Sequence, residues 1–164
     1  MLLRTTTETP LGEMTIVATD RGIVATILDD PAAELERVED RFDSRAKQAD
    51  RSLAGARREL RDYFAGRRRA LTHRVDLRWA GGGFFRRAYE AAMAVPYGEV
   101  CTYGDLASAA GSPRAWRAAG HAMRVSPIEL WIPCHRIVPA GPGWGTYGGH
   151  PDRREFLLEL EASS

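Results

Sequence analysis

Residues 79–83 read Trp-Ala-Gly-Gly-Gly and lie between two parts of the chain that differ in sequence pattern. Three consecutive glycines favour a flexible junction. Short runs rich in Thr, Val, Ile and Leu precede the junction, and amphipathic helical patterns follow it. The sequence therefore predicts an α+β fold with two domains. Residues 1–80 should form a small β-sheet domain with helices, and residues 81–164 a mainly α-helical domain.

Before the junction, the pattern predicts strands separated by two helices. Turn residues at Pro10-Leu11-Gly12 indicate a hairpin between the first two strands. We expect strands at residues 2–8, 12–19, 22–29 and 70–78, and helices at residues 32–44 and 52–65.

After the junction, two short helices are separated by Gly111. Thr102 and Asp105 are typical of a capping box for the first, and Ser112 should cap the second, with Pro113 at its first position. Helices joined in this way have the dimensions of a helix-turn-helix. We expect helices at residues 84–95, 103–110 and 151–161 and from Pro113 onward, an extended run at 128–134, and a Gly- and Pro-rich loop at 139–150.

Composition excludes several classes of protein. The chain has 164 residues, 44% hydrophobic and 27% charged, which is typical of a globular protein. No apolar run is long enough to span a membrane, and the N-terminus lacks the features of a secretory signal. We therefore expect a cytoplasmic protein, associated with the nucleoid if the source is prokaryotic. Two cysteines and four histidines show no metal-binding spacing, so no metal is expected.

The second helix of the helix-turn-helix carries a basic stripe, although the net charge of the chain is only +1. Its members are spaced i, i+3, i+7 and i+10, which puts them on one helical face, and small residues between them allow close approach of another surface. Such a stripe suits a nucleic-acid backbone, and the alternative is a solvated charged face. The stripe consists of Arg114, Arg117, His121 and Arg124, with Ala118 and Gly120 between them.

Cys134, in the run Pro133-Cys134-His135-Arg136, is the candidate nucleophile. A neighbouring histidine can supply a base, but adjacent residues in a strand point to opposite faces. A Cys–His pair here would therefore need a turn or a bridging water. The alternative is a buried, inert cysteine, which is also our interpretation of Cys101. Glu161 lies at the edge of the apolar face of the last helix, where it could turn inward and orient His135, or remain a surface residue.

Four ordered blocks of sequence resemble the O6-alkylguanine-DNA alkyltransferases, also called methylated-DNA–protein-cysteine methyltransferases. The N-terminal part also resembles this family, through Thr-Pro-Leu-Gly at 9–12 and Tyr-Phe-Ala-Gly at 63–66. The blocks are Tyr-Gly-Glu-Val-Cys-Thr-Tyr at 97–103, Ser-Pro-Arg-Ala-Trp-Arg-Ala-Ala-Gly at 112–120, Ile-Pro-Cys-His-Arg-Ile-Val at 132–138 and Tyr-Gly-Gly at 147–149.

The resemblance implies a ribonuclease H-like N-terminal domain and a single-use DNA repair reaction. The alkyl group of O6-alkylguanine, or less efficiently of O4-alkylthymine, would pass irreversibly to a cysteine after the damaged base is flipped from the duplex. No cofactor is implied. The implied partner is double-stranded DNA, bound through its minor groove largely without regard to sequence, by a monomer that could bind cooperatively.

The resemblance also implies a role for each matching residue. Cys134 would be the nucleophile, deprotonated through a water by His135, with Glu161 behind the histidine. Tyr103 would assist at guanine N3 and promote flipping, and Arg117 would enter the stack in place of the base. Met123, Trp131, Ile137, Tyr147 and Gly148 would form the substrate pocket, with the Gly148 N–H facing O6 and the carbonyls of Cys134 and Ile137 accepting from the exocyclic amine. From the relay we expect a Cys134 thiol that is partly ionised near neutral pH.

Several positions depart from the family pattern. Ser126 stands at the hinge where an asparagine is usual, and serine makes fewer hydrogen bonds. Phe85 replaces a usual glutamine, His121 a usually small residue, and Trp116 and Trp131 are bulkier than expected. Three alternatives remain at this point: a non-transferring alkyltransferase-like protein, a transcriptional regulator using the helix-turn-helix, and a cysteine hydrolase that turns over repeatedly.

Overall fold

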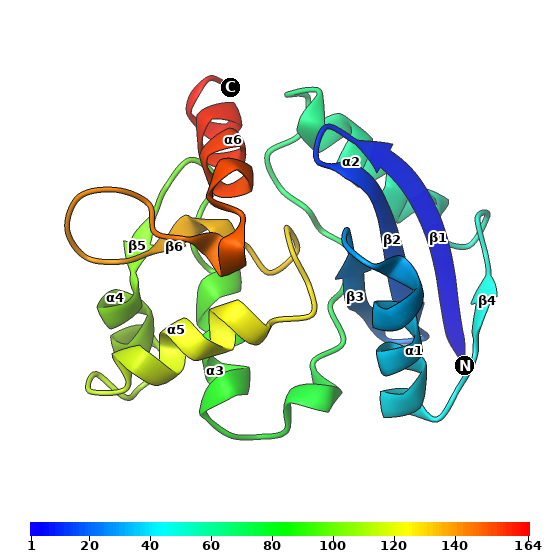
Figure 1. The fold of residues 1–164 in the computed structure, drawn as a ribbon, viewed down its shortest axis with the longest axis horizontal. Coiled ribbons are helices and arrows are strands. Elements are labelled where there is room, and N and C mark those ends of the chain that lie inside the picture. Colours follow the sequence, from blue (N-terminus) through cyan, green and yellow to red (C-terminus); the bar gives the residue numbers. More distant parts are fainter. The chain divides into compact units, whose positions relative to one another are not determined.

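Three antiparallel strands joined by tight turns begin the computed structural model, which describes residues 1–164 (Figure 1). The chain divides into two units, Met1–Asp76 and Leu77–Ser164. The elements of the first unit are β1 (Leu2–Thr9), β2 (Gly12–Thr19), β3 (Gly22–Ile27), α1 (Pro31–Phe42), β4 (Ala46–Gln48) and α2 (Ala54–Phe64). The sheet has the order β3-β2-β1-β4, in which β4 runs parallel to β1 and the other pairs are antiparallel.

The central strand β2 explains why this small sheet forms a core. Its residues from Met14 to Ala18 are all buried, so both faces of the strand are covered. Pairing of Thr9 with Gly12 leaves Pro10 and Leu11 as the two-residue turn expected from the sequence. Helix α1 contacts β3, and α2 contacts β1. The predicted α+β class is therefore confirmed for the fold.

The strand predicted at residues 70–78 does not form. Only Val75 makes a bridge, to Ile23. The reason lies in the buried carboxylate of Glu59, which accepts the backbone N–H of Thr72 at 3.0 Å and of His73 at 3.2 Å. These groups are therefore engaged by a side chain and are not available to a strand ladder. Conversely, the short edge strand β4 was not predicted, because three residues carry too little periodicity.

The second unit is built on three mutually contacting helices and two short parallel strands. Its elements are η1 (Arg78–Ala80), α3 (Phe84–Met93), β5 (Cys101–Thr102), α4 (Tyr103–Ala109), α5 (Trp116–Val125), η2 (Cys134–Arg136), β6 (Ile137–Val138), η3 (Tyr147–Gly149) and α6 (Pro151–Ala162), where η marks a 3₁₀ helix. Fully buried alanines, including Ala88, Ala119 and Ala122, let the helices approach closely. The Tyr89 hydroxyl donates to the Ala122 carbonyl at 3.0 Å and ties α3 to α5.

The capping box of α4 forms as predicted, but the start of α5 was predicted wrongly. The Thr102 hydroxyl accepts from the Asp105 N–H at 3.1 Å, and the Asp105 carboxylate accepts from the Thr102 N–H at 3.2 Å. Helix α5 begins at Trp116 and not at Pro113, and it has no side-chain cap from Ser112. The Ala115 N–H instead donates to the Ser112 carbonyl at 2.9 Å, which closes a turn before the helix. None of the helices combines the length and apolar character that crossing a bilayer requires.

Candidate active site

Cys134 is buried at the first position of the 3₁₀ turn η2. The predicted extended run at 128–134 is not a strand: the Cys134 N–H donates to the Ile132 carbonyl at 2.8 Å, and the Arg136 N–H to the Pro133 carbonyl at 2.9 Å. The sequence left two ways for Cys134 and His135 to act together, a turn in the backbone or a bridging water. The structure contains the turn. The strand alternation that would send neighbouring side chains to opposite faces therefore does not apply here.

Directly behind the cysteine, a buried ionic cluster centres on Glu161. Oε2 of its carboxylate lies 2.6 Å from His135 Nε2, and Oε1 accepts from Arg136 Nε at 2.8 Å and from the Gly98 N–H at 3.0 Å. His135 is fully buried and Glu161 is 3% exposed, so α6 turns its terminal carboxylate inward. Arg136 was not assigned a role from the sequence, yet it also donates to the Val95 carbonyl at 2.9 Å. The cluster therefore connects the turn η2, helix α6 and the segment after α3.

The cluster fixes the protonation of His135. Burial would raise the pKa of Glu161, but hydrogen bonds from His135 and Arg136 outweigh it and lower that pKa to about 2. Burial lowers the pKa of His135, only partly opposed by Glu161, so the ring is neutral at physiological pH. Because an ionised carboxylate only accepts hydrogen bonds, Nε2 carries the ring proton and Nδ1 is the acceptor. Nδ1 is buried and has no hydrogen-bond partner within the protein.

The expectation of a partly ionised Cys134 is wrong for the free protein. Burial raises the pKa of the Cys134 thiol from 9.0 to about 12, and the negative charge of Glu129 acts in the same direction. The Ser126 hydroxyl and the positive charge of Arg154 would favour the thiolate, but they do not overcome the effect of burial on the pKa. The effect of burial on the thiol therefore exceeds the effect of the ion pair that the sequence led us to expect. In the structure, His135 is neutral and supplies no positive charge to stabilise a thiolate.

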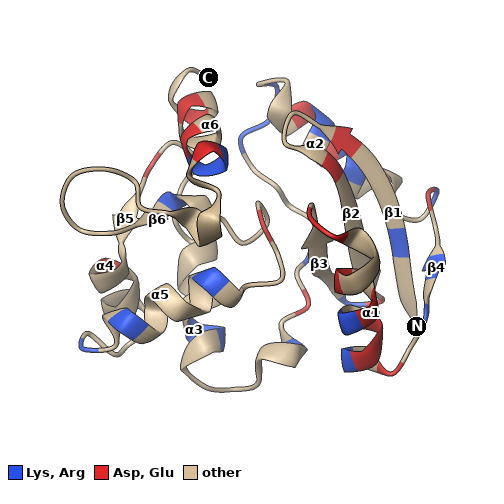
Figure 2. Cartoon of the chain, viewed as in Figure 1, with Lys and Arg blue, Asp and Glu red and all other residues tan.

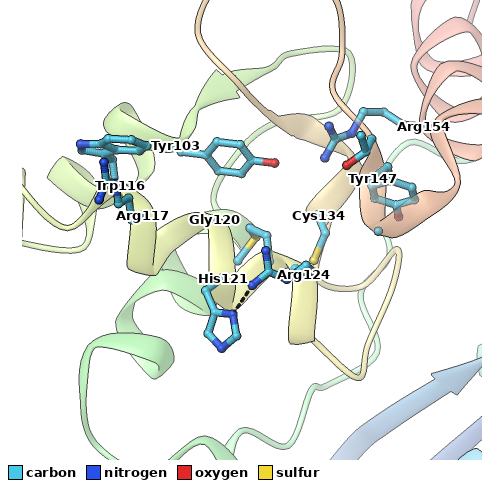
Figure 3. Close-up of a pocket in the computed structure, with 12 residues that line it drawn as sticks. Tyr103, Trp116, Arg117, Gly120, His121, Arg124, Cys134, Tyr147 and Arg154 are labelled. Atoms are coloured by element: carbon cyan, nitrogen blue, oxygen red, sulfur yellow. Dashed lines mark hydrogen bonds between the residues drawn. The ribbon is translucent and has the colours of Figure 1, made fainter.

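A pocket of about 440 Å³ opens above Cys134 (Figure 3). In this view Tyr103, Trp116 and Arg117 lie at one end, and Tyr147 and Arg154 at the other, with Cys134 between them. The lining residues come from α4, α5, η2, η3 and α6. They are Tyr103, Trp116, Arg117, Gly120, His121, Met123, Arg124, Cys134, Thr146, Tyr147, Gly148 and Arg154.

The pocket brings together most, but not all, of the residues predicted from the sequence. Trp131 and Ile137 are buried beside the turn and do not line the pocket. Ala118 is half-buried on α5, also outside the pocket lining. Arg114 does not belong to the helical stripe, because it lies in the turn before α5. Our prediction of four basic groups on one helix is corrected to three: Arg117, His121 and Arg124.

Helix α5 contains basic residues and no acidic one, as its colours in Figure 2 show, and Arg117, His121 and Arg124 are exposed on it. The Arg117 guanidinium lies 5.0 Å from the ring centre of Trp116, which is 51% exposed. Farther along, His121 Nδ1 and an Arg124 nitrogen lie 2.6 Å apart. The His121 ring lies 5.8 Å from that of Phe85, so two departures from the family pattern contact each other. An exposed basic face next to a pocket suits a polyanion whose bases can enter that pocket.

Ser126 ends α5 and contacts the segment that leads to Cys134. Its hydroxyl donates to the Ile128 carbonyl at 2.9 Å and accepts from the Ile128 N–H at 3.3 Å. The Cys134 thiol points at the same carbonyl, with sulfur and oxygen 4.0 Å apart. The serine therefore holds a turn only two residues long, with one hydroxyl serving as both donor and acceptor.

The sequence interpretation also missed Arg154, which is 2% exposed and lines the pocket. A usable signal existed, because Arg154, Leu157 and Glu161 are spaced i, i+3 and i+7, and all three are buried on one face of α6. An arginine on the buried face of a helix is uncommon and indicates a specific role. No group of three or more His, Cys, Asp or Glu side chains is arranged to hold a metal ion.

Comparison with known proteins identifies the family. Residues 2–77 match the ribonuclease-like domain, and residues 83–163 the DNA-binding domain, of 6-O-methylguanine DNA methyltransferase. The methylated-DNA–protein-cysteine methyltransferase of Mycolicibacterium paratuberculosis is 35% identical over 156 residues, covering 95% of this chain and 90% of that protein. The constitutive Bacillus subtilis enzyme is 34% identical over 163 residues, covering 98% and 95%. This chain therefore belongs to the methylated-DNA–protein-cysteine methyltransferase family, which confirms the resemblance.

Solved structures agree with this assignment. The O6-methylguanine methyltransferase of Mycobacterium tuberculosis matches with a TM-score of 0.85 and 32% identity, covering 99% of this chain and 94% of that one. The Mycobacterium tuberculosis OGT solved in complex with DNA matches with a TM-score of 0.82 and 31% identity, covering 96% and 91%. Both similarities extend over the N-terminal sheet as well as the unit that contains Cys134.

Proposed function

We propose that this protein repairs duplex DNA by transferring the methyl group of O6-methylguanine, and less efficiently that of O4-methylthymine, to Cys134 in one irreversible reaction. Residues 1–80 would form a supporting domain and residues 81–164 the domain that binds DNA and reacts. One observation carries the proposal. The Cys134 thiol lies in a pocket beside the basic face of α5, and the next residue of the same turn, His135, is paired with Glu161 of α6.

The relay starts from a neutral thiol and a neutral imidazole. His135 Nδ1 would accept the thiol proton through a water, and Glu161 would stabilise the resulting imidazolium. The buried carboxylate is already ionised, so it can do this without reorganisation. Arg136 and the Gly98 N–H hold the carboxylate in place through four hydrogen-bonded contacts with its oxygens, three from Arg136 and one from Gly98. The proton would therefore leave sulfur only once the damaged nucleobase is bound, and the free protein would contain no stable thiolate.

Transfer itself is a displacement at carbon. The bond from Sγ to the methyl carbon forms while the bond from that carbon to O6 breaks, and the electron pair of the broken bond stays on guanine. The Tyr103 hydroxyl would donate at N3 and the Gly148 N–H at O6, where the negative charge develops. The guanine then takes up a proton, which balances the one lost by the thiol. A thioether is not cleaved by water under physiological conditions, so each molecule would act once.

DNA would be engaged through α5. Arg117, His121 and Arg124 are exposed, and phosphate contacts by such groups provide affinity without reading sequence. We propose that the protein binds DNA as a monomer, with α5 docked in the minor groove, and that several monomers can bind cooperatively. Arg117 would enter the base stack as the damaged base moves into the pocket. The exposed indole of Trp116 beside Arg117 offers a second surface for stacking against bases.

A titration tests the proposal. Increasing amounts of duplex carrying labelled O6-methylguanine are incubated with a fixed amount of protein, and labelled methyl on the protein is counted. We expect transfer to stop at one methyl group for each protein molecule. Loss of more than one methyl group from the DNA for each protein molecule, with no label left on the protein, would instead indicate a hydrolase. Binding of the lesion with all label left on the DNA would indicate a non-transferring relative or a regulator.

A further inference from the structure

Arg154 is a buried positive charge in the same pocket as the nucleophile. It extends from the first turns of α6, and Figure 3 shows it beside Tyr147 on the α6 side of the pocket. Its Nη2 donates to the Ile137 carbonyl at 2.9 Å, and its Nη1 donates to the Trp144 carbonyl. Its guanidinium carbon lies 4.8 Å from the centre of the Tyr147 ring. Each of these partners is electrically neutral.

The missing counter-charge sets Arg154 apart from the other buried arginine of the unit. Arg136 is paired with the Glu161 carboxylate, whereas Arg154 forms no ion pair, and its Nε is buried without a hydrogen-bond partner. Burying a charge without a partner is costly. Hydrogen bonds to two carbonyls and an aromatic ring reduce this cost but do not neutralise the charge. Such an arrangement is favourable when negative charge forms nearby during function.

Alkyl transfer creates negative charge in this pocket. Electron density builds on Sγ of Cys134 as its proton leaves, and then on the purine as the bond to O6 breaks. Because the site is buried, a fixed charge acts there with little screening by solvent. The charged groups that act on the thiol are opposed in sign: Glu129 disfavours the thiolate and Arg154 favours it. The other titratable side chains of the pocket are Tyr103, Arg117, His121, Arg124 and Tyr147.

We propose that Arg154 is the pre-placed cation that stabilises the negative charge passing from the Cys134 sulfur to the departing purine. This inference rests on the proposed function and adds to it an electrostatic residue that the sequence interpretation did not include. The positive charge would be needed in the transition state and not for the fold. Because the purine anion is the species being stabilised, the requirement should depend on how well that purine carries negative charge.

Arg154 could instead matter only by anchoring the loop at residues 139–150 through the Trp144 carbonyl. A leaving-group comparison separates the two roles. Free O6-benzylguanine and O6-benzyl-8-azaguanine carry the same alkyl group, but 8-azaguanine is the more acidic purine and leaves more readily as an anion. A structural defect slows both substrates by the same factor. Loss of a stabilising charge slows the guanine derivative more.

The experiment measures single-turnover benzyl transfer from both bases by the wild type, Arg154→Gln, Arg154→Lys and Arg153→Met. Glutamine keeps hydrogen-bond donors without the charge, and lysine keeps the charge without the planar guanidinium group. The Arg153→Met variant is a control that removes a positive charge from the neighbouring position. We expect Arg154→Gln to lose about 100-fold with O6-benzylguanine and clearly less with the 8-aza analogue. The substrate ratios of Arg154→Lys and Arg153→Met should stay close to that of the wild type.

Equal losses on both substrates in Arg154→Gln, or no loss, would overturn the inference. If Arg154→Gln does not fold, Arg154→Lys still tests the inference, because lysine retains the charge. A ratio of the rates with the two benzylated purines unlike that of the wild type would then also overturn the inference. The wild-type reaction separates this inference from the proposed function. Absence of methyl transfer by the wild type from duplex DNA containing O6-methylguanine would contradict the function itself, whereas an unchanged substrate ratio in Arg154→Gln contradicts only the role of Arg154.

Discussion

Replacing His135 with glutamine should change the shape of the pH–rate profile and not only its height. The pKa of Cys134 is raised from 9.0 to about 12, a difference that corresponds to about 4 kcal/mol against the thiolate. At about pH 7.5, roughly one thiol in 30,000 would be ionised, compared with about 3% for a pKa of 9.0. A reaction through a preformed thiolate would therefore speed up about tenfold for each pH unit across the neutral range.

Proton transfer from the Cys134 thiol to His135 during the reaction removes this dependence of the rate on pH. Because burial lowers the pKa of His135, its neutral, accepting form persists below pH 6.5. The wild-type rate should therefore be level from about pH 6.5 to about pH 8.5 and decline only at lower pH, where the ring becomes protonated. His135→Gln retains an amide that can donate to Glu161 but has no base. At neutral pH its rate should fall by about 100-fold or more, and it should then rise with pH.

The assay is single-turnover transfer from free O6-benzylguanine, which avoids any effect of pH on DNA binding. The unfolding transition of each variant, measured at each pH, controls for loss of structure. A wild-type rate that rises about tenfold per pH unit would refute the relay, since it would indicate a thiolate formed without His135. A level profile in His135→Gln would refute it equally, because another group would then be taking the proton.

Four further outcomes follow from the site. Cys134→Ser should abolish methyl transfer while DNA binding in a gel-shift assay persists, whereas Cys101→Ser should retain transfer. Arg117→Ala should lose more transfer from duplex DNA than from free O6-benzylguanine, because the free base needs no flipping; equal losses would exclude the intercalating role. DNA affinity should fall as salt is added, and a flat response in a binding titration would contradict phosphate contacts. Glu161→Gln should lower the free energy of unfolding in urea by about 3 kcal/mol, because Arg136 is left as an unpaired buried charge, and an unchanged value would contradict the buried pair.

Elements with strong local signals were predictable from the sequence. The hairpin around Pro10-Leu11 and the capping box of Thr102 and Asp105 depend on residues close together in the chain, and both form. The run at residues 70–78 was predicted wrongly because its alternation resembles a strand. The backbone N–H groups of Thr72 and His73 instead donate to the carboxylate of Glu59, from α2. Periodicity carries no information about such a long-range hydrogen bond.

Some residues and properties of the candidate site could likewise be predicted from the sequence, and others could not. Cys134 and His135 could be selected from a sequence block, and Glu161 from its position at the edge of the apolar face of the last helix, because residue type and spacing are enough to select them. The protonation state of the Cys134 thiol could not be predicted from the sequence, because it depends on how far burial outweighs the nearby charges. Arg154 was missed because a basic residue in a charged helix is usually exposed. Its spacing relative to Leu157 and Glu161 was the available signal, and the structure shows that all three are buried on one face.

The central claim is that Cys134 accepts the alkyl group and keeps it. The most direct test is the intact mass of the protein after incubation with duplex DNA containing O6-methylguanine, followed by peptide mapping. We predict a gain equal to one methyl group replacing one hydrogen, located entirely on the peptide that contains Cys134. An unchanged mass while the DNA loses its methyl group, or a methyl group on the peptide that contains Cys101, would contradict the account.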